Sequence, residues 1–245
     1  MNCLIGHTGF VGSNILEQGN FDKCYNSKNI TDIDGMKFDL LVCAGVSGLK
    51  WKANKHPQED YEQIINLISH LNKVEFKKMV LISTGSVYDN PADNAYGSNR
   101  LYLETYLLNN FKNVSIVRLP SLFGKNLRKN SLYDLLNSDF DYLPNIKSTF
   151  QYYDLGDIWS DITIVLDNKL KVVNFGTEPL EFSKILDLFS FESLNISDDK
   201  PILNEDVQTI HAHNWGRNGK YLYSKEEIFN KLKKFVEVSK NEKRN

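Results

Sequence analysis

Short apolar runs and stretches with helical spacing alternate along the first half of the chain. The apolar runs predict strands at Asn2–Ile5, Lys23–Asn26, Phe38–Ala44, Met79–Ser83 and Val114–Arg118. Continuous runs such as FDLLVCA are typical of parallel strands that helices cover on both faces. With helices between the strands, the pattern predicts an α/β fold with a doubly wound parallel sheet.

The segments between these strands have the spacing of amphipathic helices. Helices are predicted at Phe10–Gln18 and Tyr96–Phe111. Another begins at Pro57, because proline is favoured in the first turn of a helix and apolar residues follow it at helical spacing. Predicted strands and helices therefore alternate from the first strand as far as Val114–Arg118.

The alternation loosens after Pro120. Short helices are predicted at Ser131–Leu136, Asp157–Leu166 and Phe182–Phe189, and a strand at Lys171–Phe175. The last helix is predicted from a capping-box pair, in which a serine at 224 precedes a glutamate at 227. We expect residues 1–124 to form the sheet domain and residues 125–245 to form a small mixed lobe, some of whose elements return to the sheet.

Composition narrows the class of protein. Of the 245 residues, 41% are hydrophobic and 24% are charged, and the net charge is -2, values normal for a soluble globular protein with no strong attraction to nucleic acid or membrane. No apolar run is long enough to span a bilayer, and no basic leader precedes the first strand. The odd number of cysteines, without paired spacing, indicates reduced thiols and a cytoplasmic location.

A glycine-rich turn, GHTGFVG, occupies residues 6–12 between the first predicted strand and helix. In a dinucleotide-binding turn of the Rossmann type, Gly6 permits the tight turn, Gly9 lets the backbone approach the pyrophosphate, and Gly12 lets the helix pack on the strand. The free N–H groups at the helix start favour phosphate. The three glycines are predicted to hold the pyrophosphate, and the predicted cofactor contacts of the turn are Gly6, Thr8, Gly9, Phe10, Val11 and Gly12. The alternative is a structural turn that binds no cofactor.

Three motifs together carry a family resemblance. The GxxGxxG turn, the segment STGSVY at 83–88 and the segment YGSNR at 96–100 resemble the extended short-chain dehydrogenases/reductases, which include nucleotide-sugar epimerases, dehydratases and reductases. The resemblance covers residues 1–124 and continues weakly through Tyr153–Ile158 and Asn174–Pro179. Within it, Ala44–Asp60 is similar to the matching segment of GDP-fucose synthases, which are NADP-dependent epimerase-reductases.

The resemblance implies that Thr84 and Tyr96 take part in catalysis, with Arg100 at the position of the family's lysine. Tyr96 and Arg100 lie four residues apart and therefore share one face of a helix. A fixed cation stabilises tyrosinate and makes a tyrosine usable as an acid/base near neutral pH. We expect Thr84 to hydrogen-bond the reacting oxygen and Arg100 to supply charge and bind the nicotinamide ribose. The alternative is an incidental pair on an exposed helix face.

Cofactor choice is predicted from the end of the second strand. An acidic residue there would favour NAD, but the position falls near Asn26, followed by Ser27 and Lys28. Lys28 can meet a 2′-phosphate, so we expect NADP, with NAD possible and a solvated lysine as the alternative. Further cofactor contacts are expected where two other strands end, at Cys43, Ala44, Gly45, Leu119 and Pro120.

Candidate substrate contacts follow the strand ends. Lys50 and Trp51 follow Phe38–Ala44, taken as the fourth strand, at its carboxyl end, where open α/β sheets bind ligands. The full set of candidates is Lys50, Trp51, Ser86, Asn126, Arg128, Gln151 and Tyr152. The alternative for Trp51 is a residue that packs in a lid, and the alternative for Asn126 and Arg128 is a solvated basic loop. His211 and His213 alternate in a presumed strand, but without a third ligand we expect no metal.

These features predict an NAD(P)-dependent reductase or epimerase that acts on a nucleotide-activated or modified sugar. Two alternatives stay open: an NAD(P)-binding regulatory or scaffold protein with little catalysis, and a reductase of a smaller carbonyl compound. We expect the protein to bind a small-molecule substrate, in all three cases, and to have no nucleic-acid or membrane partner. A homodimer is a further possibility.

Overall fold

A computed structural model of the chain describes residues 1–141, 143–189 and 199–243. Contacts divide the chain into two compact units. The first contains Met1–Leu119 and Asp157–Asn174, and the second contains Pro120–Gly156 and Phe175–Asn245. The first unit therefore includes a short stretch from the second half of the chain.

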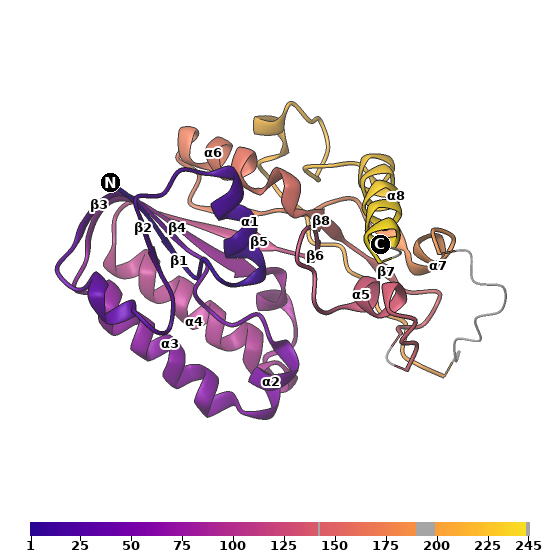
Figure 1. The fold of residues 1–245 in the computed structure, drawn as a ribbon, viewed down its shortest axis with the longest axis horizontal. Coiled ribbons are helices and arrows are strands. Elements are labelled where there is room, and N and C mark those ends of the chain that lie inside the picture. The colour runs from indigo at the N-terminus through magenta and orange to yellow at the C-terminus, as the bar shows by residue number, and fades with distance from the viewer. Residues whose placement is uncertain (142, 190–198, 244–245) are drawn as a thin grey trace. The chain divides into compact units, whose positions relative to one another are not determined.

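The first unit is built on a six-stranded sheet in which every neighbouring pair is parallel (Figure 1). Its order is β2-β1-β3-β4-β5-β9. The strands are β1 (Asn2–Ile5), β2 (Lys23–Tyr25), β3 (Lys37–Cys43), β4 (Glu75–Thr84), β5 (Val114–Leu119) and β9 (Val172–Asn174). This confirms the predicted α/β fold with a doubly wound parallel sheet.

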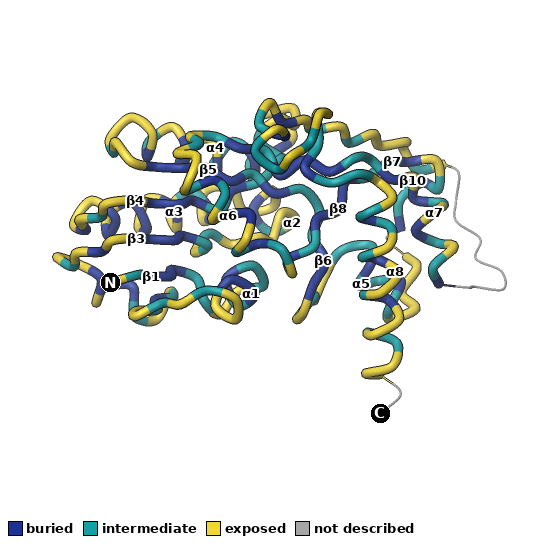
Figure 2. Tube along the Cα trace, turned by 90° about the horizontal axis from the view of Figure 1, so that it is seen from above, coloured by how far each residue is buried: buried dark blue, intermediate teal, exposed yellow. Residues whose placement is uncertain are grey.

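Helices cover both faces of this sheet (Figure 1). One face carries α1 (Phe10–Gln18) and α6 (Ile158–Asp167), and the other carries α3 (Pro57–Leu71) and α4 (Ala95–Asn110). The carboxyl-terminal halves of β3 and β4 are buried between these layers (Figure 2). Fully buried strands explain the continuous apolar runs in the sequence.

One strand fewer precedes β3 than expected, since only β1 and β2 come before it. Between β2 and β3 the chain forms a turn and the short 3-10 helix η1 (Ile30–Ile33), whose two isoleucines are buried. Phe38–Ala44 is therefore the third strand of this chain and not the fourth. β3 still lies on the other side of β1 from β2, so the chain reverses direction across the sheet between β1 and β3.

The second unit has its own apolar core. Its strands are β6 (Ser121–Phe123), β7 (Thr149–Phe150), β8 (Tyr152–Asp154) and β10 (Leu180–Glu181), paired as β6–β8 and β7–β10. Its helices are α5 (Ser131–Leu136), α7 (Phe182–Leu186) and α8 (Lys225–Glu242). Apolar residues of α5, α7 and α8 pack with Phe123 and Tyr152 in one buried cluster.

The capping box at the start of α8 is confirmed, because Ser224 and Glu227 satisfy each other's backbone N–H groups. The predicted strand around His211 and His213 is wrong: residues Ala212–Trp215 form a 3-10 turn, η5. All three cysteines are free thiols. None of the helices in the described ranges is long and apolar enough to cross a membrane.

Candidate functional site

The glycine turn between β1 and α1 is closed by backbone contacts. Gly6 has a φ of +88°, and a Cβ on it would lie 2.3 Å from the carbonyl oxygen of Ala44. A Cβ on Gly12 would lie 2.1 Å from the carbonyl oxygen of Gly6. Both positions therefore require glycine for the turn itself, independently of any ligand.

Gly9 differs from these two glycines. It has an ordinary φ of -78°, and a Cβ on it would meet only the Gly6 carbonyl oxygen, at 3.3 Å. Gly9 is the N-cap of α1. Among the residues that the structure describes, no side chain makes a capping hydrogen bond there, and the first turn of α1 has no acidic residue. The start of α1, which includes Phe10 and Val11, is thus suited to an anion, and a side chain at Gly9 would require the Gly6 carbonyl to move by a few tenths of an ångström.

The end of β2 carries an exposed cation. Asn26 forms a turn in which its side-chain oxygen accepts from the backbone N–H of Lys28 at 2.9 Å, and Ser27 and Lys28 are exposed. The Lys28 side chain has no ion-pair partner among the residues that the structure describes. His7 donates from Nδ1 to the carbonyl oxygen of Tyr25 at 3.1 Å, so it links the glycine turn to this strand end.

The end of β3 lies against the glycine turn. The Ala44 N–H donates to the carbonyl oxygen of Ile5 at 2.9 Å, and Gly45 is exposed beyond it. Cys43 is fully buried, and this burial raises the pKa of its thiol to about 11. The Cys43 side chain therefore packs in the core, and only the backbone of this segment is available to a ligand.

The end of β4 leads into the 3-10 turn η2 (Gly85–Tyr88), with Thr84 as its cap. The Thr84 hydroxyl accepts from the N–H of Ser86 at 3.1 Å. η2 packs against the start of α4, where Gly97 lies so close that a Cβ on it would be 2.1 Å from the Ser86 carbonyl oxygen. Asn94 donates to the same carbonyl oxygen at 2.7 Å. These contacts bring the segment that carries Thr84 against the helical turn that carries Tyr96.

Arg100 is buried and fully engaged within the first unit. Its guanidinium binds Asp60 through both terminal nitrogens, at 2.5 and 2.9 Å. The same nitrogens donate to the carbonyl oxygens of Ser47, at 2.6 Å, and Tyr96, at 3.0 Å. Arg100 is 3% exposed, so it does not lie on an exposed helix face, which was the alternative to a role in catalysis.

Tyr96 rests on this guanidinium. The central carbon of the guanidinium lies 3.9 Å from the centre of the Tyr96 ring. The Tyr96 backbone N–H donates to the Asn54 side chain at 2.9 Å. Its hydroxyl makes no hydrogen bond to any group in the described ranges, which leaves it available to a ligand.

The short helix α2 (Lys50–Lys55) contacts both the turn after β4, through Lys50, and the start of α4, through Asn54. Lys50 and Asn54 lie one turn apart on it, and Lys50 donates to the Ser86 hydroxyl at 3.1 Å and binds Asp89 at 2.8 Å. Trp51, on the same helix, is 65% exposed. Lys50 therefore lies at the end of β4 with its charge shared with a surface carboxylate.

A second tyrosine–arginine pair lies at the ends of β4, β5 and β9. Arg118 donates to the Tyr88 hydroxyl at 2.7 Å and binds the buried Glu104, which also accepts from Ser83. The Tyr88 hydroxyl also pairs with Asn174 at 3.0 Å. Desolvation lowers the pKa of Arg118, but the hydrogen bond and charge of Glu104 outweigh it and hold that pKa above the ordinary value.

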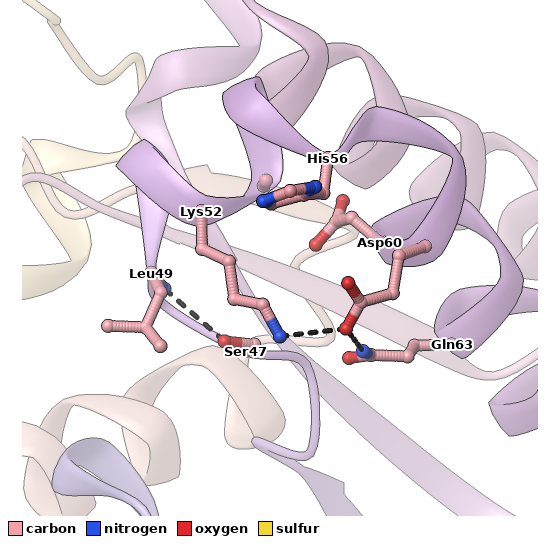
Figure 3. Close-up of a pocket in the computed structure, with 8 residues that line it drawn as sticks. Ser47, Leu49, Lys52, His56, Asp60 and Gln63 are labelled. Carbon is pink, nitrogen blue, oxygen red and sulfur yellow. Dashed lines mark hydrogen bonds and ion pairs between the residues drawn. The ribbon is translucent and has the colours of Figure 1, made fainter.

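A small polar pocket opens beside Asp60, on the loop after β3 and the adjoining turns of α2 and α3 (Figure 3). Lys52 binds Glu59 across it at 2.7 Å, and Gln63 donates to the same carboxylate. Its lining residues are Ser47, Leu49, Lys52, Ala53, His56, Glu59, Asp60 and Gln63. Because Lys52 and Glu59 already pair with each other, this pocket has no strong feature of a substrate site.

Gln151 and Tyr152, expected to line a sugar pocket, are interior residues of the second unit. The Gln151 amide donates to Thr177 and Val207 and accepts from the Val207 N–H, at 2.5, 3.0 and 2.7 Å. Tyr152 is 1% exposed, its hydroxyl pairs with Ser131, and burial raises its pKa. Both side chains therefore have structural roles here, and neither is accessible to a ligand.

The remaining expected contacts are distributed over both units. Asn126, with a φ of +67°, and Arg128 are exposed in a loop of the second unit. Leu119 is a buried end residue of β5, and Pro120, half-buried, begins the second unit. The rings of His211 and His213 lie 6.5 Å apart, and the described residues contain no group of three potential metal ligands around them or elsewhere.

Sequence reasoning missed Asp60, Asn54 and the Arg118–Glu104 pair. Asp60 and Asn54 belong to the segment that resembles GDP-fucose synthases, but nothing in their spacing indicates a partner on α4. Their contacts depend on tertiary packing between α2, α3 and α4. The one available signal was Arg100 itself, since a buried arginine requires a carboxylate partner.

Comparisons with known proteins agree with this architecture. No protein-family model and no curated sequence matches the chain. Among solved structures, the chain is similar to the NAD-dependent NDP-hexosamine 5,6-dehydratase TunA of tunicamycin biosynthesis, with a TM-score of 0.74, 14% identity and coverage of 98% of this chain and 96% of that one.

Two further structures match over nearly their whole length. UDP-glucose 4-epimerase from Thermotoga maritima, solved with UDP-glucose, gives a TM-score of 0.72 at 14% identity and covers 97% of this chain and 98% of that one. RMD from Pseudomonas aeruginosa, solved with NADPH, gives a TM-score of 0.72 at 16% identity and covers 98% of this chain and 99% of that one. Likeness at such identities concerns the fold, and this chain therefore has the Rossmann-type α/β fold that these nucleotide-sugar and dinucleotide-binding proteins share.

Proposed function

We propose that this chain is an NAD(P)-dependent oxidoreductase or epimerase that acts on a nucleotide-activated or modified sugar, with NADP as the preferred cofactor. The observation that carries the proposal is the combination of two sites at the same edge of the sheet. The glycine turn follows β1, and Thr84, next to the helical turn of Tyr96, follows β4. In open α/β sheets, ligands bind outside the carboxyl ends of the strands.

The residues of the glycine turn fit a dinucleotide. Gly9 leaves room for a pyrophosphate beside the uncapped first turn of α1, where Phe10, Val11 and Gly12 offer backbone N–H groups. Lys28, exposed after β2, would meet the 2′-phosphate of NADP. Thr8 and the backbone of Ala44 and Gly45 would border the same ligand.

Once bound, the nicotinamide would supply or accept a hydride. In this proposal Tyr96 donates a proton to the carbonyl oxygen during reduction, or removes it during oxidation of the alcohol, through a hydroxyl that has no partner among the residues that the structure describes. Thr84 holds the same oxygen by a hydrogen bond. Its hydroxyl already accepts from the Ser86 N–H, so its own proton stays available for donation.

The proposed substrate contacts in the first unit are Lys50, Trp51 and Ser86. The half-buried Ser86 donates from its backbone N–H to Thr84, Lys50 donates to the Ser86 hydroxyl, and Trp51 offers an exposed ring for stacking on a base or sugar. Asn126 and Arg128 are candidates by their chemistry alone, since both are exposed in a loop and an arginine suits a diphosphate. The neighbours described as acting on UDP-, dTDP- and NDP-linked sugars support this substrate class.

The test is a search for the substrate with the purified protein. The protein is incubated with NADPH or NADP and with a panel of UDP-, GDP- and dTDP-linked sugars, and products are identified by mass spectrometry and NMR. A reductase consumes NADPH, and an epimerase changes a ring centre without net consumption. Conversion of at least one sugar by the parent, and none by Tyr96→Phe, is the expected result. Cofactor binding without any conversion would contradict the proposal.

One observation favours a second candidate function. All four terminal N–H groups of Arg100 are used inside the protein, so this residue offers no such donor to a nicotinamide ribose in this structure. A protein that binds NAD(P) for regulation or as a scaffold would not need that donor. Such a protein would bind NADPH with good affinity, leave every sugar in the panel unchanged, and bind equally well when Tyr96 is replaced by phenylalanine.

A further inference from the structure

The Asp60–Arg100 ion pair joins three parts of the first unit. Asp60 lies in the first turn of α3, Arg100 in the second turn of α4, and the carbonyl of Ser47 in the loop after β3. The two charged side chains are 8% and 4% exposed. A pair so placed is costly to desolvate unless its hydrogen bonds are complete, and here they are.

The Asp60 carboxylate accepts three hydrogen bonds from side chains of α4. Its two oxygens accept from Arg100 at 2.5 and 2.9 Å, and one of them also accepts from Asn99 at 2.9 Å. Asn99 donates in addition to the carbonyl oxygen of Pro57, the first residue of α3. Both the position and the plane of the Arg100 guanidinium are therefore determined by Asp60.

The guanidinium in turn supports Tyr96 at two points. It stacks on the ring, 3.9 Å from its centre, and donates to the Tyr96 carbonyl oxygen at 3.0 Å. The backbone N–H of Tyr96 is held from the other side by Asn54. A stacked guanidinium fixes the plane of an aromatic ring while leaving its hydroxyl free to contact a ligand.

We propose that Asp60 is a positioning residue for Tyr96 and acts through Arg100. In this arrangement Arg100 contributes a rigid planar support, and its positive charge is balanced by Asp60. Asp60 contacts neither substrate nor cofactor. The inference rests on the proposed function only in giving Tyr96 a catalytic task; the positional relationship itself can be measured without any substrate.

The experiment uses the full chain labelled with tyrosine that carries carbon-13 at Cζ. The Tyr96 signal is assigned as the one that is missing in Tyr96→Phe. Asp60→Asn is compared with Glu59→Gln as a matched control. Glu59 is a neighbouring carboxylate of the same pocket, and it pairs with Lys52 and not with Arg100. Asp60→Asn should shift or broaden the Tyr96 signal, and Glu59→Gln should leave it unchanged.

A second variant guards against failure to fold, since Asp60→Asn leaves a buried arginine without its counter-charge. Asp60→Leu combined with Arg100→Met removes both charges and should displace the Tyr96 signal in the same way. If either variant is folded by circular dichroism and its Tyr96 signal is that of the parent, the proposal is overturned.

A parallel titration separates this inference from the proposed function. NADPH is added to the parent, Asp60→Asn and Glu59→Gln, and binding is followed by NADPH fluorescence. Failure of the parent to bind NADPH would contradict the proposed function and leave the NMR comparison valid. Displacement of Tyr96 with NADPH affinity unchanged from the parent is the result expected for a residue that positions Tyr96 without touching the cofactor. A fall in affinity of tenfold or more in folded Asp60→Asn would instead assign Asp60 to the cofactor site and overturn the inference.

Discussion

Gly97 and Ser86 are in backbone contact, so close that a Cβ on Gly97 would lie 2.1 Å from the carbonyl oxygen of Ser86. This contact joins the turn after β4 to the first turn of α4. Thr84 lies on one side of it and Tyr96 on the other. The two residues proposed to bind the reacting oxygen therefore depend on a glycine that has no chemical role of its own.

Replacement of Gly97 by alanine should separate these two segments. Alanine favours a helix over glycine by about 1 kcal/mol, but the clash with backbone atoms costs about 1–3 kcal/mol and should dominate. We expect a lower melting temperature and loss of most activity with the substrate found. Gly219→Ala is the control, because a Cβ there meets nothing within 4 Å. Parent-like stability of Gly97→Ala would show that the contact can relax without cost.

Cofactor preference depends on Lys28 in this account. NADPH should bind more tightly than NADH, and Lys28→Ala should weaken NADPH binding by about tenfold while leaving NADH binding unchanged, because a charge-assisted contact contributes about 1.5 kcal/mol or more. Lys23→Ala, which removes an exposed lysine from the start of the same strand, is the control. An equal preference of the parent for both cofactors would mean that Lys28 is only solvated.

Much of the fold was predictable from local patterns. The bounds of Phe10–Gln18 and Ser131–Leu136 agree with those of α1 and α5, where the helices start directly after the glycine turn and after the capping residue Asn130. The short strand around β9 was predictable from its apolar run. The segment with His211 and His213 was not, because alternation over so few residues does not distinguish a strand from the 3-10 turn that forms.

The site was predictable only in part. The glycine turn is encoded within seven consecutive residues, and its geometry agrees with the expected roles of Gly6 and Gly12. The environment of Arg100 is not local: its partner Asp60 is forty residues away on another helix. A motif aligned by spacing therefore located Arg100 on the correct helix and missed the carboxylate that determines what its charge does.

Replacement of Arg100 by lysine should lower both stability and activity. An ammonium cannot bind both oxygens of Asp60, reach the Ser47 carbonyl and stack on Tyr96 at once. Arg100→Met, which leaves Asp60 buried without a partner, should lower the free energy of unfolding by about 3–5 kcal/mol, and Arg100→Lys should fall between it and the parent. Urea unfolding measures this order. A lysine variant as stable and as active as the parent would restore the view of Arg100 as a simple replacement for the family's lysine.

Acid should weaken the ion pairs of Asp34 with His70 and Lys73, which precede β3 and β4 in the chain. Hydrogen bonds from Lys73, at 2.6 Å, and His70, at 2.7 Å, lower the pKa of Asp34 below its ordinary value of 3.8. A carboxylate with a lowered pKa stabilises the folded state above its unfolded pKa, and that contribution is lost as the pH falls through the folded pKa. Asp34→Asn should therefore lower the melting temperature at pH 6, and the difference from the parent should shrink steadily below about pH 4. A difference that is independent of pH would refute this assignment.

The most direct test of the dinucleotide site is titration of the parent and of Gly9→Ala with NADPH, followed by fluorescence. The φ of Gly9 suits alanine, and its Cβ would press only on the Gly6 carbonyl oxygen at 3.3 Å, so the variant should still fold, whereas its methyl group would occupy the space proposed for the pyrophosphate. We predict that NADPH affinity falls by about tenfold to a hundredfold, the equivalent of about 1–3 kcal/mol of steric conflict. A folded Gly9→Ala protein that binds NADPH as tightly as the parent would contradict the account.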